Sequence, residues 1–422
     1  MKTKPIILVI SLLVCSSVFA QLTLEECYSK ARENYPLINQ YGLIKKAEQY
    51  SLENLTKNYL PQVSFNGQAT YQSDVTTLPI DFQSLGLPIE IPSISKDQYK
   101  VTIDINQTIW DGGNTSSQKK ITKASSEVER KQIDVSLYEI EEKVTQLYFG
   151  ILAIDEKLKI LDLKEKDIQS NKETMESMFR NGTAMQSDLD QINVELLNLD
   201  QERTEQMFVK KAYCRMLSLF IHEEVSENIS LKKPIDNYTL TKEILRPELS
   251  LFDSQTALYD AKNSTITAKN MPKVSLFAQG GYGRPGLNML SDNFDFYAVG
   301  GVKLTWNFGN LYTKKNEKRL VEINKQNVEV QRETFLFNTS LQLTQEQAEI
   351  DKYKKLLIKD NEIIELRSRV KKASESKFKN GVYQTNELIR DINAEEQARQ
   401  SKALHEIQYL LSIQKFKHAQ GR

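Results

Sequence analysis

The side chains that most often carry enzyme chemistry are few in this chain and lie far apart. The three histidines, His222, His405 and His418, have no spacing that would let them share a metal ion. The sequence contains no zinc motif, no glycine-rich loop that could cradle a phosphate and no nucleophile elbow. Catalysis needs a clustered set of titratable groups, which the sequence does not supply. We therefore expect neither an enzyme nor a cofactor.

Two cysteines remain after the N-terminal segment, Cys27 and Cys214. They are too few for a disulfide framework. A single bridge between them is possible in an oxidising compartment, but we expect two small buried residues.

Charged residues recur at matched distances from two glycines. Phe179-Arg180-Asn181-Gly182 is followed six residues past the glycine by Asp188-Leu189, and Phe378-Lys379-Asn380-Gly381 is followed at the same distance by Glu387-Leu388. Glycine ends a helix in the left-handed conformation at little cost, and Arg or Lys beside it suits the negative end of the helix dipole. Each segment is predicted to be the turn of a long helical hairpin. For either copy alone, a helix stop without function is the alternative.

These turns belong to a larger internal repeat. The interval from Pro36 to Pro61 is 25 residues, and so is the interval from Pro247 to Pro272. Trp110-Asp111-Gly112-Gly113-Asn114 corresponds to Trp306-Asn307-Phe308-Gly309-Asn310, and each tryptophan precedes its turn glycine by a similar interval, 72 and 75 residues. The sequence is one unit used twice.

Each repeat contains two segments in which apolar and polar residues alternate, as in a β-strand. One begins at Tyr99, where Tyr99, Val101, Ile103 and Ile105 alternate with Lys100, Thr102, Asp104 and Asn106, and the second repeat shows the pattern most cleanly from Phe296 to Trp306. Each segment has about ten residues, enough for a tilted strand to cross a bilayer. A soluble hairpin shows the same alternation, but the aromatic residues at the segment ends favour a membrane girdle. The girdle candidates are Tyr71, Trp110, Tyr282 and Trp306.

Long helices are predicted after the second strand of each repeat. Apolar residues recur every seventh position in the second repeat, which implies helices supercoiled against their neighbours. The run from Asn114 to Arg180 would extend about 100 Å at the helical rise. An ordinary coiled-coil rod is the alternative, but it would not grow from a pair of strands. The seventh-position residues are Leu336, Leu343, Ile350, Leu357 and Ile364.

The first twenty residues read as a secretory signal peptide. Lys2 and Lys4 precede an apolar run that is too short for a membrane span, and Val18-Phe19-Ala20 forms a small-residue cleavage site. Lipidation at Cys15 is disfavoured by the preceding valine. The 56 basic and 56 acidic residues balance, so the chain offers no electrostatic footprint for nucleic acid. No later stretch has the apolar length of a membrane helix, so membrane insertion would have to use strands.

Four strands cannot close a barrel, and open strand edges cannot face lipid, so insertion requires oligomerisation. The predicted organisation is a signal peptide at 1–20, a first repeat at 21–217, an inter-repeat link at 218–247 and a second repeat at 248–422. Strands are expected at about 62–72, 98–110, 273–283 and 294–308, and helical hairpins at about 114–217 and 311–415, with tips at 182 and 381.

The mature sequence resembles the TolC-like outer-membrane efflux proteins. The resemblance rests on Leu22-Thr23-Leu24-Glu25-Glu26-Cys27, on Asn34-Tyr35-Pro36, on Leu60-Pro61-Gln62-Val63 and on the ordered repeat. It implies an α+β membrane protein built as a homotrimer, with four strands per subunit forming a twelve-stranded barrel in the outer membrane and a long helical barrel in the periplasm. It further implies an exit duct that works with a periplasmic adaptor and an inner-membrane transporter, in efflux pumps or type I secretion systems.

The resemblance also implies roles for the tips. Gly182, Thr183 and Ala184, with Gly381, Val382 and Tyr383, would dock the adaptor. Members of the family close their entrance with acids six and nine positions after the second tip glycine. Here these positions hold Glu387 and Arg390, with Asp391 next and Asp188 in the first repeat. Because rings of one charge sign select permeants by sign, the base at the second position should lower cation selectivity. A solvated pair on a helix is the alternative reading.

A periplasmic coiled-coil adaptor or scaffold is the main alternative function. It predicts a single hairpin flanked by separate β-domains, whereas this sequence carries duplicated units with bilayer-length strands.

Overall fold

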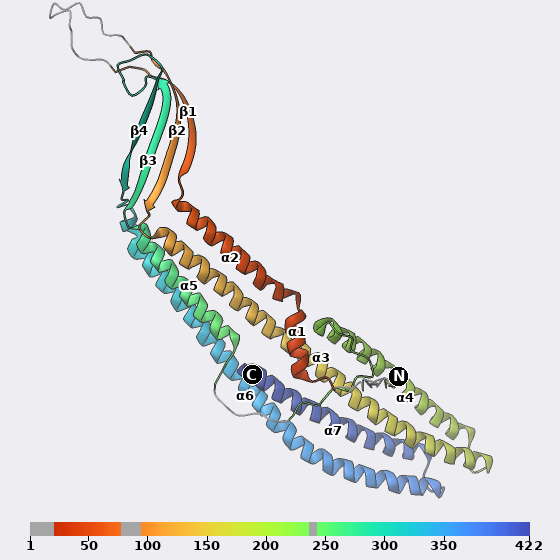
Figure 1. Cartoon of the computed structure of the whole chain (residues 1–422). Coiled ribbons are helices and arrows are strands. Elements are labelled where there is room, and N and C mark those ends of the chain that lie inside the picture. Colours follow the sequence, from red (N-terminus) through yellow and green to blue (C-terminus); the bar gives the residue numbers. More distant parts are fainter. Residues whose placement is uncertain (1–20, 77–93, 236–242) are drawn as a thin grey trace, which may run out of the picture. The chain divides into compact units, whose positions relative to one another are not determined.

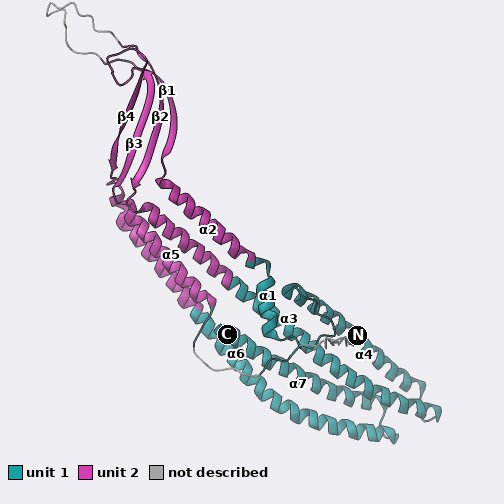
Figure 2. Cartoon of the chain, viewed as in Figure 1, with its two compact units in different colours: residues 1–38, 135–246, 336–422 teal, residues 39–134, 247–335 magenta. Residues whose placement is uncertain are grey.

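The computed structural model describes residues 21–76, 94–235 and 243–422. The predicted signal peptide and Cys15 lie outside this range, as do 77–93 and 236–242. The chain divides into two compact units, shown in Figure 2. The hairpin unit comprises the described parts of Met1–Ile38, Val135–Arg246 and Leu336–Arg422, and the sheet unit comprises those of Asn39–Asp134 and Pro247–Phe335. These units differ from the predicted domains, because each combines segments from both sequence repeats.

The sheet unit contains one four-stranded antiparallel sheet with the order β1-β2-β3-β4 (Figure 1). Its strands are β1 Gln62–Tyr71, β2 Asp97–Trp110, β3 Lys273–Arg284 and β4 Asp295–Thr305. The last strand ends three residues before the predicted boundary, since Asn307 forms a turn in which its Oδ1 accepts the Gly309 N–H at 2.9 Å. The two sequence repeats therefore each supply a hairpin to one continuous sheet.

The strand register sorts the side chains onto two different faces. Phe65 pairs with Ile103, Ile103 with Gly280 and Gly280 with Ala298, so residues of this parity form an apolar face. Polar side chains dominate the opposite face, where Asp104 accepts hydrogen bonds from Asn66 at 2.7 Å and from Thr102 at 2.9 Å. The apolar face comprises Val63, Phe65, Gly67, Ala69, Tyr71, Tyr99, Val101, Ile103, Ile105, Val274, Leu276, Ala278, Gly280, Tyr282, Phe296, Ala298, Gly300, Val302 and Leu304.

Helices adjoin one end of the sheet. The sheet unit holds α2 Gln40–Thr56, the short η2 Lys57–Tyr59, α5 Pro247–Lys269 and the starts of α3 Asn114–Arg180 and α6 Asn310–Lys379. Asp111 begins α3, because its two carboxylate oxygens accept the N–H groups of Gly113 at 2.9 Å and Thr115 at 2.6 Å. Gly112 has a φ of +71°, and a Cβ there would lie 2.5 Å from that of Met271. The Trp-Asp-Gly-Gly motif thus turns the chain from strand to helix.

The hairpin unit is helical. It contains α1 Leu24–Asn34, most of the short η1 Pro36–Asn39, α4 Gln186–Ile221, α7 Thr385–Gln420 and the remainders of α3 and α6. Thr23 and Glu26 form a capping box at the start of α1. The helix α4 runs four residues past the predicted end of its hairpin, and α7 five residues past.

Long helices form two hairpins, α3–α4 and α6–α7, whose cores join at the tips. A buried cluster takes residues from all four helices, including Leu161, Ile192, Phe378 and Leu388. Cys27 and Cys214 are buried and free, which confirms the prediction of two small buried residues. None of the described helices combines the length and the apolar character needed to cross a membrane.

Candidate functional site

The two predicted turns have the same backbone geometry. Gly182 and Gly381 have φ values of +73° and +71°, in the left-handed region that favours glycine. At the first turn, the N–H groups of Gly182 and Thr183 donate to the carbonyls of Phe179 and Met178, both at 3.0 Å. At the second, Gly381 and Val382 donate to Phe378 and Lys377, both at 2.9 Å. This double bond pattern is a Schellman motif, which satisfies the last carbonyls of each helix.

The acids six residues past each glycine cap the next helix. Asp188 Oδ2 accepts the Met185 N–H at 3.0 Å, and Glu387 Oε2 accepts the Gln384 N–H at 3.1 Å. A carboxylate here satisfies an N–H group and suits the positive end of the helix dipole. The six-residue spacing from glycine to acid in the sequence therefore spans the turn, from the end of one helix to the residue that caps the start of the next helix.

The predicted docking residues form a small exposed surface at the turns. Gly182, Thr183, Gly381 and Val382 are exposed, while Ala184 and Tyr383 are half-buried against the apolar cluster of the tips. Met185, which was not among the predicted docking residues, is 73% exposed, and Val382 is 72% exposed. The position of Met185 in the sequence could have indicated this exposure, because it is an apolar residue directly beside a predicted turn.

The predicted gate residues have different environments. Arg390 has 69% of its side chain exposed, and its Nε lies 3.7 Å from Asp391 Oδ1. Asp391 is buried, and its Oδ2 accepts the Ser374 hydroxyl at 2.5 Å. Asp188 Oδ1 accepts the Thr385 hydroxyl at 3.2 Å. Of the three gate candidates after the second turn, Arg390 is exposed, Glu387 is half-buried and Asp391 is buried.

Two half-buried lysines, Lys371 and Lys164, form ion pairs that link the two hairpins. The Lys371 ammonium contacts Asp167 of the first hairpin and lies 3.0 Å from a Glu395 oxygen, with 13% of its side chain exposed. Lys164 lies 3.0 Å from Glu195 and 2.7 Å from Glu396. Burial by itself lowers the pKa of each lysine, but the paired carboxylates outweigh it and raise the pKa above the usual value.

Removing the Lys371 charge should therefore destabilise the hairpin unit. In Lys371→Met, Glu395 keeps a side chain that is 5% exposed but loses one of its two cationic partners. Breaking such a buried pair costs about 3 kcal/mol, so we expect the thermal unfolding midpoint to fall by several degrees at pH 7. Lys372→Met, at an exposed neighbour, is the matched control and should change stability by less than about 0.5 kcal/mol.

The loss of thermal stability in Lys371→Met should become smaller at low pH. Burial raises the pKa of Glu395, but Arg399 and Lys371 outweigh it and hold that pKa below its usual value of 4.5. A lowered carboxyl pKa contributes stability above the unfolded pKa, and that contribution is lost as the pH falls through the folded value. The difference in midpoint between wild type and Lys371→Met should therefore shrink below about pH 4.5. An equal difference at pH 4 and pH 7 would contradict this assignment.

The predicted girdle aromatics lie in two rows at opposite ends of the sheet. Tyr71 and Tyr282 lie at the loop end, where Tyr282 pairs with Phe296. Trp110 and Trp306 lie where the strands meet the helices, and the Trp306 indole donates to the Asn270 carbonyl at 3.2 Å. All four side chains are between 42% and 79% exposed.

Residues 27–205 match the family model described as "Outer membrane efflux protein". A comparison with curated protein sequences finds no match. Among solved structures, the chain is similar to the outer-membrane channel OprN at 13% identity and a TM-score of 0.67, covering 94% of this chain and 89% of that one. The chain is also similar to VceC from Vibrio cholerae, at 10% identity and a TM-score of 0.66, covering 94% of this chain and 96% of that one. The similarity to CusC is at 12% identity and a TM-score of 0.67, covering 95% of this chain and 92% of that one.

The structural matches extend over nearly the whole chain, and the family match covers the first strand pair and most of the first helical hairpin. The combination of long helices with four antiparallel strands therefore matches the fold of those channels. Residues 27–205 thus match the outer membrane efflux protein family, and the chain as a whole has the TolC-like fold of the outer-membrane channels to which it is similar.

Proposed function

We propose that three copies of this chain form a passive exit duct of a tripartite efflux pump or a type I secretion system. Their sheets would close a twelve-stranded barrel in the outer membrane, and their helices would line a conduit through the periplasm. An inner-membrane transporter would supply the energy, because no catalytic constellation is expected in this chain.

The observation that carries the proposal is the sheet itself. Both β1 and β4 have a free backbone edge in the described chain, and most of the apolar face that they share with β2 and β3 is exposed. Free edges cannot face lipid, and pairing β4 of one copy with β1 of the next satisfies both. A closed barrel then places the apolar face toward lipid and the polar face toward the lumen.

The mass of the native assembly tests the closed barrel. We expect a trimer when the protein is extracted in detergent from separated outer membranes. A monomer or dimer recovered from the periplasm would mean that the strands do not meet lipid, and the coiled-coil scaffold would then become the better description.

The tips are proposed to dock the periplasmic adaptor. They present an exposed surface that includes the apolar side chains of Met185 and Val382. The backbones of the two turns that hold these side chains have the same geometry. An exposed apolar patch with a polar surround is a common mark of a protein contact.

Arg390 is proposed to set ion selectivity at the entrance. Threefold symmetry would form a ring of three Arg390 groups, and a positive ring disfavours cations. We expect Arg390→Asp to raise the cation-to-anion permeability ratio several-fold in planar bilayers. Arg369→Asp is the control, since 67% of that side chain is exposed on α6, away from the turn. An unchanged reversal potential in Arg390→Asp would remove Arg390 from the entrance.

A further inference from the structure

A group of bases lies where the strands meet the helices. In the spans 57–61, 111–123, 269–272 and 306–319, the acids are Asp111 and Glu317. This imbalance is local, since the whole chain has equal numbers of bases and acids. We call these bases the basic collar: Lys57, Lys119, Lys120, Lys123, Lys269, Lys314, Lys315, Lys318 and Arg319.

The two acids inside these spans offset only two of the nine positive charges. Asp111 is buried and caps α3. Glu317 accepts the Thr313 hydroxyl at 2.7 Å. In the part of the chain that the structure describes, no collar side chain forms an ion pair. Lys119 and Lys314 are half-buried, and the other collar side chains are exposed.

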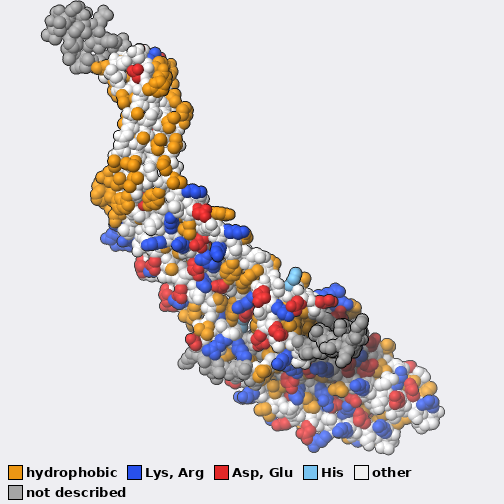
Figure 3. Space-filling model, in the orientation of Figure 1, with side chains coloured by type: hydrophobic (Ala, Val, Ile, Leu, Met, Phe, Trp, Pro, Cys, Tyr) orange, Lys and Arg blue, Asp and Glu red, His pale blue; other side chains and the backbone are white. Residues whose placement is uncertain are grey.

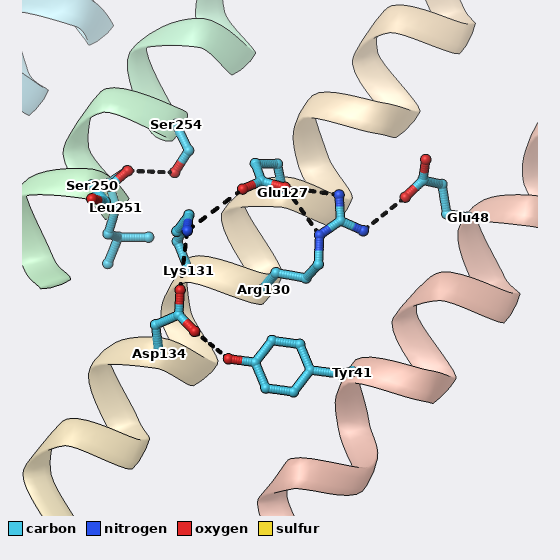
Figure 4. A network of polar contacts seen from close by, with 9 residues as sticks. All are labelled: Tyr41, Glu48, Glu127, Arg130, Lys131, Asp134, Ser250, Leu251 and Ser254. Carbon is cyan, nitrogen blue, oxygen red and sulfur yellow. Dashed lines mark hydrogen bonds and ion pairs between the residues drawn. The ribbon is translucent and has the colours of Figure 1, made fainter.

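Bases farther along the same helices behave differently. Figure 4 shows Arg130 between Glu48 and Glu127, and Lys131 between Glu127 and Asp134. On α6, Lys325 lies 2.9 Å from Asp260. The sheet unit thus pairs its charges within one or two helical turns of the collar, which makes the unpaired state of the collar a local property of the strand–helix junction.

Along α6, one exposed surface changes from apolar to basic. The Trp306 ring packs on Phe308, with centroids 4.7 Å apart. Leu311 and Tyr312 follow, and Tyr312 is 88% exposed. Lys315 lies four residues after Leu311 and Lys318 seven, a spacing that places all three on one helix face. In Figure 3, hydrophobic side chains gather where the strands meet the helices, and Lys and Arg side chains follow, interspersed with Asp and Glu.

This order of surfaces matches the boundary of a membrane leaflet. Acyl chains contact an apolar face, aromatic rings lie at the interface, and headgroups lie just beyond. The positive ends of the dipoles of α3 and α6 add charge of the same sign at this level. A cationic band beside an apolar band attracts anionic lipid by about 1 kcal/mol per base near the surface.

We propose that the basic collar binds the phosphate groups of anionic phospholipids in the leaflet that faces the helices. The proposal rests on the proposed function, because it requires the sheet to lie in a membrane. It extends that function by naming the lipid class that fixes the depth of the strands. The collar would let the strands insert deeply enough to bury Trp306 and Phe308, and would resist deeper insertion.

Native mass spectrometry of the detergent-extracted full chain tests the proposal. Phosphatidylglycerol and phosphatidylethanolamine with the same acyl chains are the probes. We expect wild type to bind phosphatidylglycerol in preference to phosphatidylethanolamine. In a triple variant that combines Lys315→Gln, Lys318→Gln and Arg319→Gln, this preference should fall about tenfold. The preference should weaken as salt shortens the screening length. Glycerol phosphate at the same concentration should not displace the lipid, because it lacks the acyl chains.

The matched control is Lys354→Gln, Lys355→Gln, Lys372→Gln, which removes the same charge from exposed positions on the same helix. It should keep the wild-type preference. Equal losses in both variants, no preference in wild type, or full displacement by glycerol phosphate would each overturn the proposal. So would a shifted reversal potential with unchanged lipid binding, because the bases would then line the conduit.

Conductance separates this proposal from the channel itself. A wild-type protein that conducts but shows no preference for phosphatidylglycerol refutes the collar and leaves the duct intact. A protein that neither conducts nor fractionates with outer membranes refutes the duct, and the collar with it.

Discussion

Phe65→Arg should deplete the protein from the outer membrane by at least about tenfold, because an arginine on the lipid face near the bilayer centre costs about 2–4 kcal/mol. Phe65 lies in the middle of β1 on the apolar face and is 72% exposed in the single chain. In the proposed trimer the penalty would apply to each of three copies. The measurement is the amount of assembled protein in separated outer membranes, compared with wild type at equal synthesis.

Ser64→Arg supplies the control for this prediction. It lies next to Phe65 in the same strand, on the polar face, where it pairs with Asp104 and so meets a charge of the opposite sign. If that face lines a water-filled lumen, a charge there should be accepted, and Ser64→Arg should accumulate as wild type does. Depletion of both variants alike would indicate that the two faces do not meet different solvents, and would count against the barrel.

Replacing both tip glycines with valine should reduce export by at least about tenfold while trimers still assemble. A β-branched residue is strongly disfavoured in the left-handed conformation that Gly182 and Gly381 adopt, at a cost of about 1–3 kcal/mol for each turn. Nothing lies within 4 Å of a Cβ placed at either position. The substitution therefore acts on the backbone of the turn and not on packing, and the proposed docking surface would change shape.

The valine variants need a control with open space and an ordinary backbone. Gly42 in α2 meets both conditions, since nothing lies within 4 Å of its Cβ and its φ is not positive. Gly42→Val should leave export unchanged. The measurements are substrate export in cells and crosslinking of the tips to the adaptor. Normal export by the double tip variant would remove the tips from the docking site.

Local patterns in the sequence were enough to predict the strands, the long helices and both turns. The alternation in β2 is a property of a strand with one apolar face. The glycine turns are equally local, because a left-handed residue and the capping acid six positions later are fixed by backbone geometry. The element order followed from the repeat, since two copies of a pattern constrain each other.

Tertiary packing decided which side chains at equivalent positions of the two repeats are buried and which are exposed. Phe179 and Phe378 hold the same motif position, yet the first is 40% exposed and the second is 2% exposed. Asp391, predicted beside an entrance, is buried against Ser374. Both outcomes depend on which neighbour each helix face meets, and a periodic sequence is compatible with several neighbours.

The pairing of charges also required the structure. Lys371 and Asp167 are 204 residues apart, and nothing near either residue predicts their contact. The unpaired collar is the converse case, because its bases were visible in the sequence but their lack of partners was not. The sequence by itself determined the strands, helices and turns of this protein, since backbone geometry and side-chain periodicity act over a few residues. Only the tertiary structure decided which charges are neutralised and which face solvent, because that depends on segments brought together from both repeats.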